Sequence, residues 1–174
     1  MKYLSITACF LLWAGWVSAQ SSLFIPFGQT AEEVKSYLDS RDYIVSVTED
    51  EELQSLRVVL DNEKMVEYAF KDGALYATTV TRNYLDKKKG REIQKSCLDY
   101  MKQIGVGDLV QTEENKVMCY TTVTDSRIIK LFVQMHPKSL TLTLTAFSKR
   151  YGPMEQDENF YYEVEILQRK FISN

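Results

Sequence analysis

The chain has 174 residues, a formal net charge of −3, and apolar side chains at 45% of its positions. A mildly acidic chain of this kind argues against sequence-independent nucleic-acid binding, which needs a basic surface. Its length fits a single domain with a substantial hydrophobic core.

The first 19 residues have the pattern of a secretory signal peptide. Lys2 stands near the start, an apolar run is centred on residues 9–16, and small residues at 17–19 precede Gln20. We predict cleavage between Ala19 and Gln20, which leaves a mature domain of residues 20–174. The apolar run is too short to span a bilayer, so the mature chain is expected to carry no transmembrane anchor.

This pattern predicts an exported protein that is periplasmic, attached to the cell surface or secreted. Lipidation of Cys9 is an alternative, although Cys9 precedes most of the apolar run instead of following it. Neither the organism nor the oligomeric state follows from the sequence.

A first helix and four strands are predicted in residues 28–84. Thr30 and Glu33 form a capping box, so a helix should begin at Ala31 and end near residues 40–42. Strand-like runs follow at 43–48, 56–60, 65–70 and 75–81, and the Asp72-Gly73 dipeptide between the last two indicates a hairpin.

The same order of elements recurs in residues 85–151. A helix is predicted between Asp86 and Gly105, secure over 91–104, because Gly90 weakens its first turn by about 1 kcal/mol relative to alanine. Strands are expected at 108–112, 117–124, 127–135 and 140–147. The segments Lys35–Asp39 and Lys95–Asp99 are identical at four of five positions, which indicates an internal duplication.

The tail of residues 152–174 alternates apolar and polar side chains from Phe160 to Leu167, which predicts one more half-buried strand. Together the elements predict an α+β fold. Two tandem repeats of a helix and antiparallel strands would form one sheet of about eight strands, with both helices packed on one face.

Two cysteines, Cys97 and Cys119, remain in the mature chain. Both are expected on buried faces, one on the second helix and one on a following strand. Because an exported protein meets an oxidising environment, we predict a disulfide between them, with two buried thiols as the alternative.

The sequence contains no catalytic constellation, metal-binding spacing or cofactor motif, so no catalytic residue, metal ligand or cofactor is predicted. The single histidine, His136, is expected in an exposed turn, and the acidic run at 49–52 lacks the spacing of a calcium loop. The cations Lys87, Lys88, Lys89 and Arg91 either form a solvated face or contact anionic lipid or another polyanion.

A hydroxyl-bearing sheet face is the candidate binding surface. Threonines alternate with leucines from Leu140 to Thr145, so leucines are expected toward the helices and threonines toward solvent. The predicted binding face comprises Tyr76, Tyr120, Thr122, Thr124, Thr141, Thr143 and Thr145.

The element order, with the Phe27-Gly28-Gln29-Thr30 entry into a helix that begins near Glu32-Glu33-Val34, is similar to that of small exported modules such as the β-lactamase inhibitor protein and BamE-type envelope proteins. The resemblance transfers no functional residue. We expect an exported, non-catalytic binding module for a protein or cell-envelope component. The alternatives are a secreted enzyme without a recognisable motif, or a carbohydrate or small-ligand binding protein.

Overall fold

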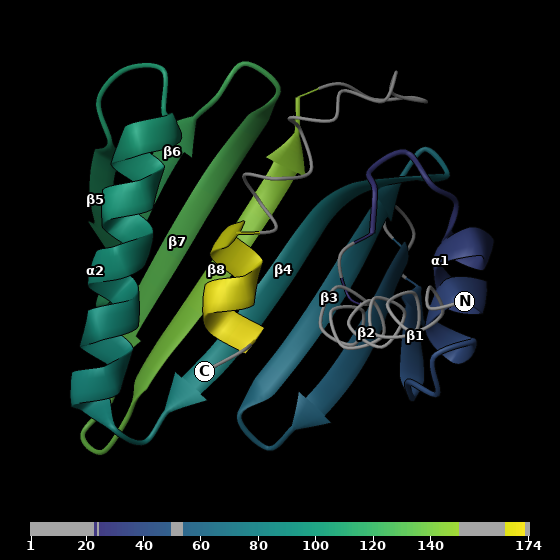
Figure 1. The fold of residues 1–174 in the computed structure, drawn as a ribbon, viewed down its shortest axis with the longest axis horizontal. Helices are drawn as coiled ribbons and strands as arrows, with labels where there is room; N and C mark the ends of the chain where they lie inside the picture. Colours follow the sequence, from purple (N-terminus) through teal and green to yellow (C-terminus); the bar gives the residue numbers. More distant parts are fainter. Residues whose placement is uncertain (1–22, 24, 50–53, 150–165, 173–174) are drawn as a thin grey trace, which may run out of the picture.

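The structure is a computed structural model that describes residues 23, 25–49, 54–149 and 166–172 (Figure 1). The cleavage point at Ala19 and Gln20 lies outside these residues, as do Cys9, most of the acidic run and residues 160–165 of the predicted tail strand. The described part contains one antiparallel eight-stranded sheet in the order β1-β2-β3-β4-β8-β7-β6-β5. The predicted α+β class and the single sheet are therefore confirmed.

The eight strands follow the predicted order closely, with boundaries that differ by a few residues. They are β1 (Val45–Glu49), β2 (Gln54–Asp61), β3 (Lys64–Lys71), β4 (Ala74–Tyr84), β5 (Val110–Glu114), β6 (Val117–Val123), β7 (Arg127–Met135) and β8 (Leu140–Ser148). Asp72 and Gly73 have positive φ angles of 52° and 77°, the backbone conformation that a tight hairpin requires.

Helix α1 (Ala31–Asp39) begins as its capping box predicts. The Glu33 amide donates to the Thr30 hydroxyl, and the Thr30 amide donates to the Glu33 carboxylate at 2.8 Å. These bonds satisfy backbone donors that the first helical turn otherwise leaves unpaired. The bond from the Thr30 amide, with one from the Thr30 hydroxyl, lowers the pKa of the Glu33 carboxylate.

Helix α2 (Lys87–Ile104) begins about one turn before residue 91, where the secure part of the predicted helix starts. The Asp86 side chain caps it by accepting from the amides of Lys88 and Lys89, and Gly105 ends it. Gly90 is buried, and a Cβ atom there would lie 2.8 Å from Leu140 Cδ2 and 3.0 Å from Tyr84 Cβ. The glycine therefore lets the helix start close to the sheet, which outweighs its low helix propensity.

The predicted tail strand is wrong over its described part, because residues 166–172 form a third helix. Leu167 and Phe171 are four residues apart and both are fully buried, which is the spacing of one helical face. The helix is further held by Gln168, which donates to Thr78 Oγ1 at 3.0 Å, and by Arg82, which donates to the Phe171 carbonyl at 2.7 Å.

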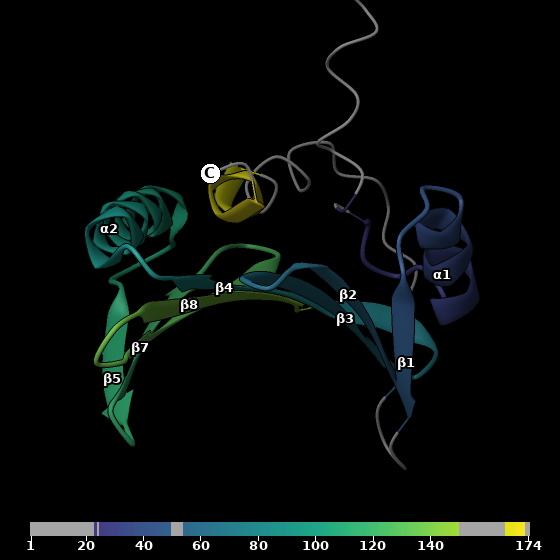
Figure 2. The ribbon, with the colours of Figure 1, turned by 90° about the horizontal axis from the view of Figure 1, so that it is seen from below.

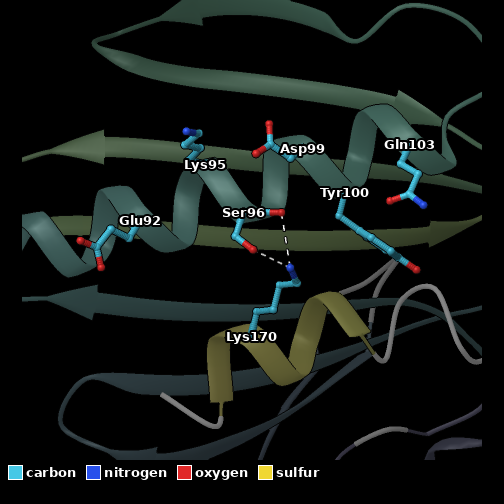
Figure 3. A pocket seen from close by; sticks show the side chains of 7 residues that line it. All are labelled: Glu92, Lys95, Ser96, Asp99, Tyr100, Gln103 and Lys170. Atoms are coloured by element: carbon cyan, nitrogen blue, oxygen red, sulfur yellow. Dashed lines mark hydrogen bonds between the residues drawn. The ribbon is translucent and has the colours of Figure 1, made fainter.

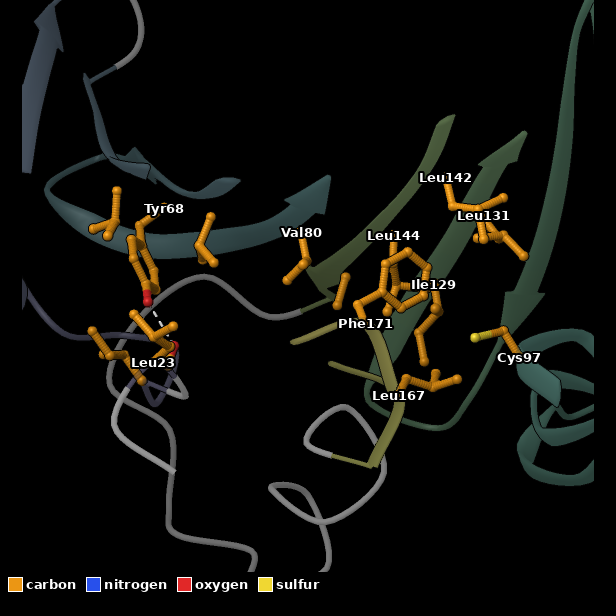
Figure 4. Packing of buried hydrophobic residues seen from close by; sticks show 14 of the residues in the cluster. Leu23, Tyr68, Val80, Cys97, Ile129, Leu131, Leu142, Leu144, Leu167 and Phe171 are labelled. Atoms are coloured by element: carbon orange, nitrogen blue, oxygen red, sulfur yellow. Dashed lines mark hydrogen bonds between the residues drawn. The ribbon is translucent and has the colours of Figure 1, made fainter. Parts of the chain in front are cut away.

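Figure 2 shows the sheet as an arch with α2 and the C-terminal helix on its convex side and α1 beside β1 at one end. The core lies under these helices, where Leu131, Leu144 and Phe171 belong to one hydrophobic cluster (Figure 4). The Tyr68 hydroxyl enters this core and donates to the Leu23 carbonyl at 2.6 Å, and burial raises its pKa.

None of the helices in the described ranges combines the length and the apolar character needed to cross a membrane.

Candidate functional site

The two faces of the sheet differ in what covers them. On β8 the side chains of Leu140, Leu142, Leu144 and Ala146 are buried in the core, and the intervening side chains point to the other face. No described helix lies on that concave side of the arch (Figure 2). We call it the open face.

A ladder of polar pairs runs along the centre of the open face, where β4 pairs with β8. The hydroxyls of Thr79 and Thr145 lie 3.0 Å apart, and those of Thr81 and Thr143 lie 3.2 Å apart. Thr141 continues the series by donating to Asn83 Oδ1 at 3.3 Å. This threonine ladder comprises Thr79, Thr81, Asn83, Thr141, Thr143 and Thr145, and each hydrogen bond fixes the rotamers of two neighbouring side chains.

Charged side chains continue the ladder toward both ends of the sheet. Opposite residues in the strand register form the row Arg57, Glu67, Thr79, Thr145 and Lys130. Arg57 Nη2 lies 3.3 Å from Glu67 Oε2, whereas Lys130 contributes a positive charge on the other side of the ladder. The row therefore presents an ion pair on one side of the neutral hydroxyls and a single cation on the other side.

Aromatic rings flank the same surface. The rings of Tyr76 and Phe147 have centroids 6.4 Å apart, and Lys130 Nζ lies 5.8 Å from the centroid of Phe147. Tyr76 falls at a register shift between β3 and β4, which is a place where a bulge redirects a side chain. Phe132 joins this face opposite Thr143.

The structure divides the predicted binding face into two groups. Thr141, Thr143 and Thr145 lie together on the open face, and the ring contact with Phe147 places Tyr76 beside them. Thr145 is nevertheless only 7% exposed. Tyr120 and Thr122 lie on the covered side, opposite the core residues Leu131 and Ile129, and Thr124, just after β6, is buried.

Thr122 has a structural role in place of the predicted one. Its hydroxyl donates to the Met101 carbonyl at 3.1 Å, which joins β6 to the last turn of α2. The phase of β6 was ambiguous in the sequence because apolar residues occupy both of its faces, with Met118 and Tyr120 on one and Val117 and Val123 on the other.

Sequence reasoning missed Thr79, Thr81, Asn83 and Lys130 as members of the open face. An available signal was the alternation from Thr78 to Tyr84, in which the polar Thr79, Thr81 and Asn83 lie between residues of the opposite face. The register shift at Tyr76 means that this phase could not be counted from the Asp72-Gly73 hairpin. The missing information was the pairing of β4 with β8, two strands that are distant in the sequence.

The predicted disulfide between Cys97 and Cys119 is wrong, since both thiols are free. Cys97 is fully buried on the core side of α2, where burial raises its pKa to about 12. Cys119 lies opposite Phe132 on the open face, with its sulfur 3.8 Å from Thr121 Oγ1. The sheet backbone separates the two side chains, so they cannot approach to bonding distance.

A groove of about 400 Å³ lies between α2 and the C-terminal helix (Figure 3). Lys170 Nζ reaches across it to Ser96 Oγ at 2.5 Å and lies 5.8 Å from the centre of the Tyr100 ring. A serine beside a lysine suggests a nucleophile and its base. Ser96, however, stands in the middle of a helix whose amides are engaged in helical hydrogen bonds, so they are not available to stabilise an oxyanion. The pair joins two helices.

Within the described ranges, no group of three His, Cys, Asp or Glu side chains is placed to hold a metal ion. His136 lies in the turn between β7 and β8, where its amide donates to the Ser139 carbonyl at 3.0 Å. This is the turn position that the sequence predicted.

No protein family model matches the chain, and neither a curated protein nor a solved structure does. Its function is therefore inferred from the geometry of its own side chains.

Proposed function

We propose that the protein is an exported, non-catalytic binding module that holds a protein partner on the open face of its sheet. The observation that carries the proposal is the threonine ladder on a sheet face that no described helix covers. Its hydroxyls are pre-ordered by cross-strand pairing, so a partner that binds there has less rotamer freedom to remove.

A protein partner fits the composition of this face. Tyr76, Phe132 and Phe147 supply aromatic surface. Arg57, and Met65 opposite Thr81, are of residue types enriched at protein interfaces. An extended, arched surface suits contact over a wide area, whereas a small ligand is normally held in a concave pocket that buries most of it. Two grooves of about 400 Å³ lie on the other side of the sheet, one between α2 and the C-terminal helix and one lined by residues 87–95 of α2.

Site-specific photo-crosslinking in the producing cells tests this proposal. A crosslinker at Thr143 or Lys130 on the open face is expected to capture a discrete protein, and one at the exposed Ser36 of α1 is not. Thr143→Arg should weaken binding of the captured protein at least about tenfold, because it places a bulky cation in the interface. Ser36→Arg is the matched control. Capture from Ser36 alone, or equal effects of both arginines, would refute the proposal.

Export is supported by the signal-peptide pattern before Gln20. The product recovered outside the cytoplasm should begin at or near Gln20. It should also lack tryptophan fluorescence, because both tryptophans, Trp13 and Trp16, precede the cleavage point. An exported product that retains Trp emission would contradict the predicted cleavage.

We also infer that the domain arose by duplication, with α1 and α2 on the same face of the sheet. One helix followed by four strands occurs twice, and the two sets of strands enter the sheet in mirrored order. Val34 and Leu38 of α1 share one hydrophobic core with Cys97 and Met101 of α2. An experimental structure in which Lys35–Asp39 and Lys95–Asp99 occupied different positions within the two halves would contradict the duplication.

A further inference from the structure

We propose a second interaction surface at the start of α2, which docks the protein onto anionic lipid headgroups of a membrane surface. Residues 87–95 contain five cations and one carboxylate, although the chain as a whole is acidic. The side chain of Lys138 adds another exposed cation from the neighbouring β7–β8 turn. We call this surface the basic end: Lys87, Lys88, Lys89, Arg91, Lys95 and Lys138.

The basic end is one continuous surface built from two segments. Lys87 Nζ donates to the Pro137 carbonyl at 2.8 Å, which ties the first turn of α2 to the β7–β8 turn. A groove of about 410 Å³ on the α2 part of this surface is lined by Lys87, Lys88, Arg91, Glu92 and Lys95. Four of these five side chains are cationic, so the groove suits a phosphate group of a lipid headgroup.

Helix stability does not explain these cations. The positive end of the helix dipole disfavours cations in the first turn, and the first turn of α2 has no acidic residue, whereas α1 has Glu32 and Glu33 in the equivalent place. Among the described residues, no carboxylate lies within ion-pair distance of Lys88, Arg91 or Lys95. Their charges are therefore available to an external anion.

Exposed apolar side chains favour a membrane surface over a soluble polyanion. Leu85 is 66% exposed and immediately precedes the cap of α2, and Met135 is 56% exposed beside the β7–β8 turn. Cations flanked by apolar side chains are typical of interfacial binding, in which the charges meet the headgroups and the apolar groups enter the acyl boundary. The surface is distinct from the open face, so the two proposals stand independently.

Vesicle cosedimentation of the chain that begins at Gln20 tests the proposal. Binding is expected to phosphatidylcholine vesicles that contain phosphatidylglycerol, but not to phosphatidylcholine alone, and it should weaken as salt is raised. The double variant Lys88→Ala/Arg91→Ala should lower the partition coefficient about 30-fold, because each cation near the membrane surface raises that coefficient roughly fivefold. The control double variant Lys102→Ala/Lys116→Ala removes the same charge elsewhere and should change binding less than about threefold.

Leu85→Ser separates lipid from a soluble polyanion. It should weaken binding to the anionic vesicles and leave any binding to inorganic polyphosphate unchanged, with circular dichroism confirming that each variant is folded. The proposal is overturned if anionic vesicles are not bound, if the control variant loses as much binding as the basic-end variant, or if polyphosphate competes fully and Leu85→Ser has no effect on vesicles.

Discussion

The two sides of strand β8 show how one strand serves two purposes. Leu142 and Leu144 are buried under the helices, whereas Thr141 and Thr143 lie half-buried on the open face. Full burial of a leucine contributes about 1.5–3 kcal/mol, but a cross-strand threonine pair contributes only about 0.2–1 kcal/mol. Stability is therefore concentrated on the covered side, and the open face can change its side chains at little cost to the fold.

The largest difference between the two sides is expected in thiol chemistry. Cys97 is fully buried on the covered side, and Cys119 is half-buried on the open face. Alkylation of Cys97 requires an opening of the structure that costs several kcal/mol, and burial raises its pKa to about 12. Near neutral pH, Cys119 should react at least about a thousandfold faster, as measured by mass spectrometry of alkylated peptides.

The pH must be controlled in that experiment. The folded pKa of Cys97, about 12, lies above that of an unfolded thiol, about 8.5. Between these values the unfolded state releases its proton first, so alkaline pH lowers the stability of the fold and exposes Cys97. Equal labelling rates at neutral pH would show that α2 does not cover Cys97. If no alkylation is found even after denaturation without a reducing agent, the cysteines form a disulfide.

Truncation of a covered leucine is the next largest effect. Leu144→Ala removes a side chain that is 1% exposed from the centre of the core, so it should lower the free energy of unfolding by about 2–5 kcal/mol. Urea denaturation followed by circular dichroism measures the change. A loss below about 1 kcal/mol would mean that the core collapses around the cavity or that Leu144 is not buried in solution.

The sequence predicted the elements whose signals are local. The capping box of Thr30 and Glu33 placed the start of α1, the Asp72-Gly73 turn placed a hairpin, and alternation within β8 assigned its two faces. These features are determined by residues close together in the sequence, so they form independently of how the rest of the chain packs.

The errors concern features that depend on distant contacts. The sequence indicated only the cost of Gly90 in helix propensity. In the structure, the absence of a side chain at Gly90 lets α2 pack closely against Tyr84 and Leu140. The helix at 166–172 forms where Arg82 and Thr78 supply hydrogen bonds from β4. The face of β6 was ambiguous because both of its sides carry apolar residues, so only packing against α2 decides it.

The same substitution on the two faces sharpens the comparison further. Thr122→Val on the covered side removes the hydroxyl that donates to the Met101 carbonyl at 3.1 Å. That carbonyl also accepts from the Gly105 amide at 3.1 Å, so it keeps one partner and the loss should be near 1 kcal/mol. Thr122→Ser keeps the hydroxyl and serves as the control in urea denaturation. A neutral Thr122→Val would show that this bond does not hold α2 to β6.

Thr143→Val on the open face should have the smallest effect, within about 0.5 kcal/mol. Valine keeps the β-branched shape that suits a strand, and the change removes only the 3.2 Å contact with Thr81. Thr81 is half-buried, so water can replace the lost partner, whereas water cannot reach Thr122, which is 2% exposed. Urea denaturation of Thr143→Val beside Thr122→Val measures the difference directly. A loss above about 1 kcal/mol at Thr143 would mean that the threonine ladder supports the fold instead of standing ready for a partner.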